Sequence, residues 1–266
     1  MSRATSRIAT PDDGGAVRLI RVIGIGAGHP DQVTVEAIAA MRSVDFFITA
    51  DKGGHDPLLA AREALLTRHL DVVPPVVAVR DPERDRTTSS TTTATDYDRA
   101  VIDWHDARAE VFERAILDHE GDVGFLVWGD PAFYDSTIRI VEKVLARGKV
   151  EAVWDVIPGI SSLQMLAARH RIVLHGIGQP ILVTTGRRLR EAVEAGADNI
   201  LVMLNARLEL TGLEEWQIWW GTNLGTKDER LVNGAVGDVL DQILTQRAEV
   251  KSVAGWVMDV YLLRKP

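Results

Sequence analysis

Two short glycine-bearing segments carry the strongest hint of chemistry in this sequence. Residues 24–28 (Gly-Ile-Gly-Ala-Gly) and residues 129–131 (Gly-Asp-Pro) each follow an apolar run that is typical of a β-strand. Glycine lets the backbone approach a ligand closely, and Asp130 offers a carboxylate acceptor for hydroxyl or amine groups. Two such strand ends in one domain predict a single small ligand held between them.

Both segments also have plainer interpretations. In the dinucleotide pattern G-x-G-x-x-G, Gly24 and Gly26 match, but His29 stands at the third glycine position and Gly28 falls one residue early. This mismatch counts against a Rossmann-type oxidoreductase. In favour of one, Asp51 lies just after the second expected strand, near where such enzymes have a ribose-binding acid. Asp130 could instead cap a helix that starts at Pro131.

A third segment, residues 158–162 (Pro-Gly-Ile-Ser-Ser), ends another apolar run. Proline and glycine stop a strand, and Ser161 or Ser162 can cap the helix that follows. A serine that caps a helix can also line a site, so both roles stay open here.

Composition excludes several classes of function. The chain has 266 residues, a formal charge of −8 and no cysteine, so disulfides, thiolate catalysis and cysteine-bound metals are impossible. The net acidity disfavours nucleic acid as a partner. No apolar run reaches the about 20 residues that span a bilayer, and we expect a cytoplasmic protein without a membrane partner. The histidines lack metal-ligand spacing, and no metal is expected.

The elements that must position these segments alternate along the first half of the chain. Apolar runs predict strands, and runs with apolar residues on one helical face predict helices. Residues 1–17 are predicted to be a disordered leader, and residues 18–158 an N-terminal α/β domain with a mainly parallel sheet. The expected strands are residues 18–25, 46–49, 72–79, 125–128 and 153–157; the expected helices are residues 32–42, 57–69, 97–119 and 136–147.

The second half, residues 159–266, is predicted to be a C-terminal α/β domain. Its expected strands are residues 181–184, 200–204, 217–220 and 255–263. One helix is expected after the serines at 161–162, and two more are expected at residues 189–195 and 236–247. Between the third strand and the long helix, a charged segment and a Ser/Thr tract occupy residues 81–95. This polar stretch is expected to be either a lid or a flexible linker.

Four motifs in order make the chain resemble the tetrapyrrole (corrin and porphyrin) methyltransferases. They are residues 22–28 followed by Thr34, residues 129–134, residues 156–162 and residues 184–187. The resemblance implies two α/β domains with an inter-domain cleft, a mixed sheet in the C-terminal domain, a homodimer, S-adenosylmethionine as methyl donor, S-adenosylhomocysteine as product and a tetrapyrrole substrate.

Further segments narrow the resemblance to one member of the aerobic corrin pathway. They include residues 51–53, 81–86, 104–105, 219–221, 224–226 and 255–264. The function this implies is methylation of precorrin-5 at C1, with loss of the C20 acetyl group as acetate. Methylation of another precorrin carbon, a nicotinamide-dependent oxidoreductase and a non-catalytic tetrapyrrole carrier remain as alternatives.

The resemblance also implies a set of cofactor contacts. Carried over position by position, they are Ala27, Gly28, Trp128, Gly129, Asp130, Phe133, Ser161, Ser162, Leu204, Asn205 and Leu224. This chain departs from the family pattern at Ala27, where proline is frequent, and at Leu204-Asn205, where a Met-Gly pair is frequent.

Candidates for the remaining roles come from residue chemistry. Acetate loss calls for a base and for a donor to the acetyl oxygen, and we expect Asp51 or His55 in the first role and Tyr134 or Lys52 in the second. The acidic side chains of a tetrapyrrole call for guanidinium groups, which bind carboxylates bidentately. The arginine candidates are Arg84, Arg86, Arg139, Arg187 and Arg188.

Overall fold

The computed structural model describes residues 17–51, 57–82 and 94–266, with only the backbone described at residues 57 and 94–101. The expected leader therefore lies outside the described residues except for Val17, which is exposed. Of the segment 81–95, only Asp81, Pro82 and the backbone of 94–95 are described.

By their contacts the residues form two compact units. The described residues of the first unit fall within Met1–Ile23, Val35–Val127 and Tyr134–Ile157, and those of the second within Gly24–Thr34, Trp128–Phe133 and Pro158–Pro266. The second unit thus includes both glycine-bearing loops, although the sequence places these loops among the strands of the first.

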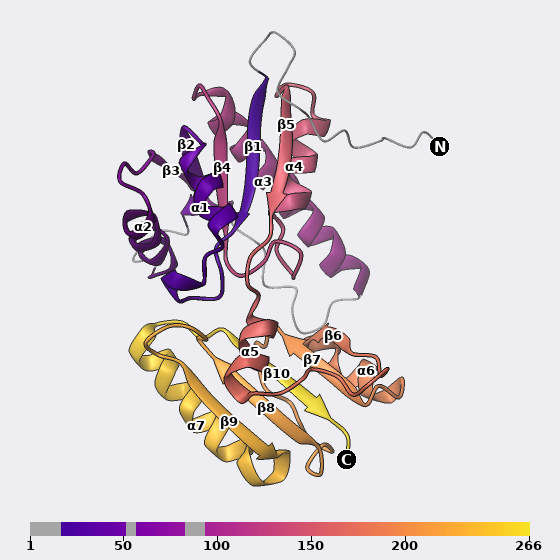
Figure 1. The fold of residues 1–266 in the computed structure, drawn as a ribbon. Coiled ribbons are helices and arrows are strands. Elements are labelled where there is room, and N and C mark those ends of the chain that lie inside the picture. Colours follow the sequence, from indigo (N-terminus) through magenta and orange to yellow (C-terminus); the bar gives the residue numbers. More distant parts are fainter. Residues whose placement is uncertain (1–16, 52–56, 83–93) are drawn as a thin grey trace. The chain divides into compact units, whose positions relative to one another are not determined.

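The first unit is built on a parallel five-stranded sheet in the order β3-β2-β4-β1-β5 (Figure 1). Its strands are β1 (Arg18–Gly24), β2 (Phe46–Asp51), β3 (Val76–Arg80), β4 (Val123–Val127) and β5 (Ala152–Ile157). Its helices are α1 (Val35–Arg42), α2 (Pro57–His69), α3 (Ala94–Leu117) and α4 (Thr137–Ala146). The predicted α/β class with a mainly parallel sheet is confirmed.

One face of this sheet packs on α3 and α4. Phe46 and Ile48 of β2 lie in one buried cluster with Phe112 of α3 and Ile140 of α4. Side chains alternate between the faces of a strand, so Phe47, which is 1% exposed, points to the opposite face. Burial on both faces explains why these strands are apolar runs without polar alternation.

The second unit is built on a mixed sheet in the order β6-β7-β10-β8-β9. Strands β6 (Leu182–Thr185) and β7 (Asn199–Met203) pair in parallel, whereas β10 (Asp259–Arg264) runs antiparallel to β7 and to β8 (Gln217–Thr222). Antiparallel β9 (Arg230–Ala235) completes the sheet. The expected mixed sheet is confirmed.

The alternation of β10 positions the helices of this unit. Tyr261 and Leu263 pack with residues of α6 (Leu189–Glu194) and α7 (Val236–Ala254), and Val260 and Leu262 pack with α5 (Ser162–His170). The helix α5 therefore lies on the face of the sheet opposite α6 and α7.

Several sequence predictions need correction. Strand β9 was not expected, because its sequence RLVNGA contains asparagine and glycine, which have low strand propensity. The strand expected at residues 255–263 begins only at Asp259, because α7 continues to Ala254 and Gly255, with φ +78°, ends it in a left-handed conformation. The helix expected at residues 32–42 is a 3₁₀ turn, Pro30–Gln32, followed by α1.

Candidate active site

The two glycine-bearing loops are bonded directly to each other within the second unit. The Gly26 amide donates to the Gly129 carbonyl at 3.2 Å, and the Gly129 amide donates to the Gly26 carbonyl at 2.8 Å. Gly26 has φ +81° and Gly129 has φ +73°, a region that side chains with a Cβ disfavour. The glycines are therefore required by the backbone conformation itself.

A third backbone segment closes on this pair. A Cβ added to Gly159 would lie 2.1 Å from the Gly129 carbonyl oxygen and 2.9 Å from Gly24 Cα, and a Cβ added to Gly24 would lie 2.6 Å from the Gly159 nitrogen. We call Gly24, Gly26, Gly129 and Gly159 the glycine junction. It brings together three chain segments that are far apart in the sequence.

Asp130 braces this junction. One carboxylate oxygen accepts the Gly159 amide at 2.9 Å, and the other accepts the Ala132 amide at 2.8 Å. No helix begins at Pro131, since residues 131–134 form turns and bends and α4 starts at Thr137. The interpretation of Asp130 as a helix cap is therefore wrong, and so is the expectation that Pro131 starts a helix.

Ser161 caps α5, as one of its two interpretations expected. It forms a capping box with Gln164, whose side chain accepts the Ser161 amide at 2.7 Å. Ser161 is 2% exposed, and Ser162 is the first residue of the helix. The cap fixes the direction in which the chain leaves the glycine junction.

Ala27 and Gly28 pack on the loop that follows β8. A Cβ on Gly28 would lie 2.6 Å from the Leu224 carbonyl oxygen, and Ala27 and Leu224 share a buried cluster with Leu166 of α5. Since the side chains of Ala27 and Leu224 are 5% and 3% exposed, a ligand here would meet mainly backbone atoms.

Leu204 and Asn205 follow β7 and are held by a charged pair. Leu204 has φ +55° and is 61% exposed. The Arg247 guanidinium donates to the Asn205 carbonyl at 2.7 Å and to Asp259 at 2.9 Å, and Asp259 also accepts the Trp220 indole N–H at 3.3 Å. The pair positions a backbone turn that leucine would not adopt readily by itself.

Two aromatic candidates follow β4. Trp128 meets Trp256 edge to face, with ring centroids 6.3 Å apart, and Phe133 is 38% exposed. Asn223 places Trp256, because its side-chain amide donates to the Trp256 carbonyl at 3.3 Å. Trp128 thus has a fixed neighbour, and Phe133 presents a large part of its ring to solvent.

Two buried polar atoms lie near the carboxyl ends of β6 and β7. Among the described residues, Thr185 Oγ1 and Asn205 Oδ1 are buried and have no hydrogen-bond partner in the protein. Buried polar atoms are nearly always paired, so such atoms mark a place where a bound molecule could supply the partner. Gly129 adds open space, since a Cβ there would meet only Ser161 Cα, at 3.9 Å.

Comparisons with known proteins identify the family of this chain. The model of the Tetrapyrrole (Corrin/Porphyrin) Methylases matches residues 20–240. Precorrin-6A synthase [deacetylating] of a Sinorhizobium species is 43% identical over 260 residues, which cover 94% of this chain and 96% of that protein. The chain belongs to the tetrapyrrole methylases.

Solved structures of similar proteins have the same fold. A protein described as related to cobalamin synthesis (CobF), from Corynebacterium diphtheriae, superposes with a TM-score of 0.78 at 35% identity, covering 94% of this chain and 99% of that one. Cobalt precorrin-4 methyltransferase, CbiF, superposes with a TM-score of 0.59 at 16% identity, covering 93% and 96%, and shows the fold alone. As a tetrapyrrole methylase, the chain is a methyltransferase, and this family generally uses S-adenosylmethionine.

The catalytic candidates that the structure describes lie in the first unit of this tetrapyrrole methylase. Asp51 is the last residue of β2, and its carbonyl accepts the Asp81 amide at 2.8 Å. Tyr134 has φ +53° and is 43% exposed. Lys52 and His55 lie outside the described residues.

The structure describes the side chains of Arg139, Arg187 and Arg188 among the arginine candidates. Arg188 forms two hydrogen bonds with Glu191, at 2.7 and 2.9 Å, which lower the pKa of that carboxyl. Arg139 is exposed and donates to the Asp135 carbonyl at 3.4 Å, and Arg187 is exposed after β6. Arg84 and Arg86 lie outside the described residues.

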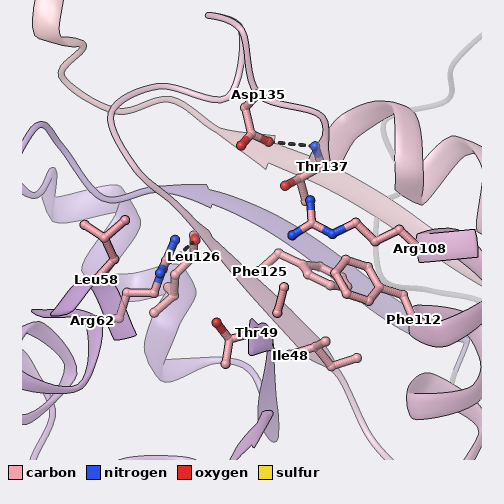
Figure 2. Close-up of a pocket in the computed structure, with 11 residues that line it drawn as sticks. Ile48, Thr49, Leu58, Arg62, Arg108, Phe112, Phe125, Leu126, Asp135 and Thr137 are labelled. Carbon is pink, nitrogen blue, oxygen red and sulfur yellow. Dashed lines mark hydrogen bonds between the residues drawn. The ribbon is translucent and has the colours of Figure 1, made fainter. Parts of the chain in front are cut away.

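Sequence reasoning missed a cavity of about 100 Å³ in the first unit, which Figure 2 shows. Two guanidinium groups, from Arg62 of α2 and Arg108 of α3, enter it from opposite sides. The usable signal was the spacing of Trp104 and Arg108, four residues apart on one helix, where the Arg108 guanidinium stacks 4.6 Å from the indole centroid.

Two negative findings apply to the part of the chain that the structure describes. No group of three or more histidine, aspartate or glutamate side chains could hold a metal ion. No described helix has the length and apolar character needed to cross a membrane.

Proposed function

We propose that this chain is an S-adenosylmethionine-dependent C-methyltransferase of corrin biosynthesis, which methylates precorrin-5 at C1 and releases the C20 acetyl group as acetate to give precorrin-6A. The observation that carries the proposal is the 43% identity to precorrin-6A synthase [deacetylating] over nearly the full length of both proteins. The segments that resemble this member of the family belong to the same similarity and lie in both halves of the chain.

The proposed cofactor contacts all belong to the second unit, at the glycine junction and the loops beside it. When bound, S-adenosylmethionine supplies an electrophilic methyl group on a positively charged sulfur. The backbone of Gly28, Gly129 and Asp130 would line the pocket, and Asn205 Oδ1 would accept a hydrogen bond from the ligand. Trp128, Phe133, Ser162 and Leu204 would supply the surrounding surface, whereas Ala27, Ser161 and Leu224 are buried and would act through their backbone atoms.

Loss of the acetyl group requires one water molecule per turnover. The water oxygen adds to the acetyl carbonyl, the bond from that carbon to C20 breaks, and the group leaves as acetate while the macrocycle keeps the electron pair or takes a proton. Asp51 or His55 would receive the proton from the water, and Tyr134 or Lys52 would donate to the acetyl oxygen. Replacing Asp51, His55 and Tyr134 singly tests this, and rates of both half-reactions within about threefold of the parent would contradict it.

Substrate recognition, assembly and location complete the proposal. Arg84, Arg86, Arg139 and Arg187 would bind carboxylates of the tetrapyrrole, and Arg188 would do so only by giving up its pair with Glu191. The active form would be a homodimer in the cytoplasm.

Three ligands separate this proposal from its rivals. Calorimetric titration should give saturable binding of S-adenosylhomocysteine and of the tetrapyrrole, and none of NAD or NADP. Binding of a nicotinamide cofactor without S-adenosylhomocysteine would favour an oxidoreductase. Binding of the macrocycle alone would favour a carrier.

A further inference from the structure

Asn223 is a buried residue with an unusual backbone conformation, directly after β8. It is 1% exposed and has φ +47°, in the left-handed region that residues with a Cβ rarely adopt. Asparagine tolerates this region better than most residues, because its short polar side chain can bond nearby backbone groups. Such a conformation persists only where the surrounding structure holds it, and residues of this kind cluster at ligand sites. The hydrogen bonds of Asn223 therefore indicate what its conformation serves.

The first set of these bonds holds the segment between α7 and β10. Asn223 Oδ1 accepts the Met258 amide at 2.8 Å, and Asn223 Nδ2 donates to the Trp256 carbonyl at 3.3 Å. The backbone amide of Asn223 donates to the Met258 carbonyl at 2.9 Å. The carboxamide thus acts as acceptor and donor at once, which an apolar side chain could not do. Asn223 fixes the backbone on both sides of Val257.

The second set of bonds holds the loop to which Asn223 itself belongs. Its carbonyl accepts the Thr226 amide at 3.1 Å and the Thr226 hydroxyl at 2.8 Å. This loop packs closely on Gly28, where an added Cβ would lie 2.6 Å from the Leu224 carbonyl oxygen and 2.8 Å from Thr226 Cγ2. The position of the loop therefore determines how much space is left beside Gly28.

Trp256 connects Asn223 to a second proposed cofactor contact, Trp128. The rings of Trp256 and Trp128 meet edge to face, with centroids 6.3 Å apart and planes at 81°. An aromatic pair of this geometry contributes about 0.5–1.5 kcal/mol beyond the area that it buries. Trp128 directly precedes Gly129 of the glycine junction. One buried asparagine is thus bonded to two loops, of which one packs on Gly28 and the other on Trp128.

We propose that Asn223 is a positioning residue of the cofactor site, which couples the loop beside Gly28 to the loop beside Trp128. Since Asn223 is 1% exposed, it acts through these two residues rather than by touching the ligand. Residues behind a site can matter greatly, because a misplacement of about 1 Å can cost about a hundredfold in rate. The proposal rests on the proposed function, which makes Gly28 and Trp128 contacts of S-adenosylmethionine.

Two substitutions separate the hydrogen bonds of Asn223 from its backbone conformation. Asn223→Gly removes the side-chain bonds but supplies a residue that adopts φ +47° readily, whereas Asn223→Ala removes the same bonds and adds the strain of a Cβ. In calorimetric titration, the dissociation constant for S-adenosylhomocysteine should rise at least tenfold in both variants. In urea, the alanine variant should be the less stable of the two. Asn223→Gly keeps the test valid if the alanine variant fails to fold.

Asn199→Ala is the matched control within the same unit. Asn199 is 8% exposed and also holds a loop, because its side-chain amide donates to the Leu174 carbonyl at 3.0 Å and the Pro180 carbonyl at 3.1 Å. It begins β7, whereas the proposed cofactor contacts Leu204 and Asn205 follow the opposite end of that strand. This variant should lose stability but bind S-adenosylhomocysteine with the affinity of the parent.

Fluorine NMR of protein labelled with fluorotryptophan tests the coupling without any ligand. The resonances of Trp128 and Trp256 can be assigned by replacing each tryptophan singly with phenylalanine. Both resonances should shift in Asn223→Gly and stay in place in Asn199→Ala. A purely structural role of Asn223 would lower stability without moving the Trp128 resonance of the folded protein.

Three results would overturn the coupling. They are S-adenosylhomocysteine affinity of Asn223→Gly within about threefold of the parent, an equal loss of affinity in Asn199→Ala, and an unshifted Trp128 resonance in folded Asn223→Gly. If the parent itself does not bind S-adenosylhomocysteine, the proposed function fails. The fluorine spectra still decide in that case whether Asn223 couples the two loops.

Discussion

The glycine junction of the second unit and the arginine-lined cavity of the first are built from different parts of the chain. The junction is made of backbone: three segments approach so closely that a single Cβ on Gly159 would collide with the Gly129 carbonyl. The cavity is made of long side chains on α2 and α3. A substitution in the junction should therefore strain the backbone, whereas a substitution in the cavity should remove side-chain contacts and leave the backbone unstrained.

The largest effect is expected for Gly159→Ala. The added Cβ would lie 2.1 Å from a backbone oxygen that cannot rotate away, so the free energy of unfolding should fall by about 3 kcal/mol or more. For a chain of this size, that corresponds to a drop of about 6–12 °C in Tm. Thermal unfolding and titration with S-adenosylhomocysteine should show both losses.

Gly176→Ala is the matched control for that experiment. A Cβ there would meet nothing closer than the flexible Gln179 side chain, at 3.2 Å. If both variants lose equal stability, close backbone contact at the junction is not the reason.

The second-largest loss of stability is expected for Asp259→Ala, which tests whether the Arg247–Asp259 pair stabilises the turn at Leu204. The change leaves Arg247 Nε and the Trp220 N–H without their acceptor. Breaking such a pair costs about 3–5 kcal/mol when fully buried, and about 2–3 kcal/mol is expected here because Arg247 is 21% exposed. Urea unfolding measures the loss.

Glu110→Gln controls for the removal of an ion pair as such. Its pair with Arg114 is exposed on α3 and should contribute less than about 0.5 kcal/mol. A similar loss in both variants would contradict the assigned role of Asp259.

How far the sequence leads differs between the two regions. Segments 24–28, 129–131 and 158–162 could be predicted because glycine, proline and serine favour particular backbone conformations locally. The structure brings these three segments together. The bracing role of Asp130 could not be predicted, since it depends on the Gly159 amide, 29 positions away in the chain.

The cavity as a whole could not be predicted, for the same physical reason. The spacing of Trp104 and Arg108 marks Arg108 alone, and only the packing of α2 and α3 brings Arg62 and Arg108 to one cavity. The order of the other strands and helices could be predicted from apolar periodicity. Strand β9 could not, because it is stabilised by pairing with β8 rather than by the strand propensity of its own residues.

Asp130→Asn should have a smaller effect that separates bracing from charge. Asparagine keeps one acceptor oxygen but turns its amide nitrogen toward one of the two backbone donors, Gly159 or Ala132. The expected cost is about 1–2 kcal/mol in stability. If Asp130 also contacts the cofactor, the free energy of S-adenosylhomocysteine binding should fall by more than the free energy of unfolding. Unchanged affinity would mean that Asp130 only stabilises the junction.

The smallest effect concerns pH and His170, at the end of α5. Burial lowers the pKa of His170 from its ordinary value of 6.5, while its ring nitrogen bonds the Trp220 carbonyl at 2.9 Å. Because the unfolded chain binds the proton more readily, the stability due to neutral His170 is present above pH 6.5 and is lost as the pH falls below it. His170→Gln keeps a donor, and urea unfolding should show a weaker pH dependence; an unchanged profile would contradict this.

Mass spectrometry tests the proposed function most directly, with precorrin-5 as acceptor and S-adenosylmethionine that carries a deuterated methyl group as donor. We expect a macrocycle that has gained one labelled methyl group and lost its acetyl group, with one acetate and one S-adenosylhomocysteine released per turnover. A product that gains the methyl group but keeps the acetyl group, or an unchanged macrocycle, would contradict the proposed function.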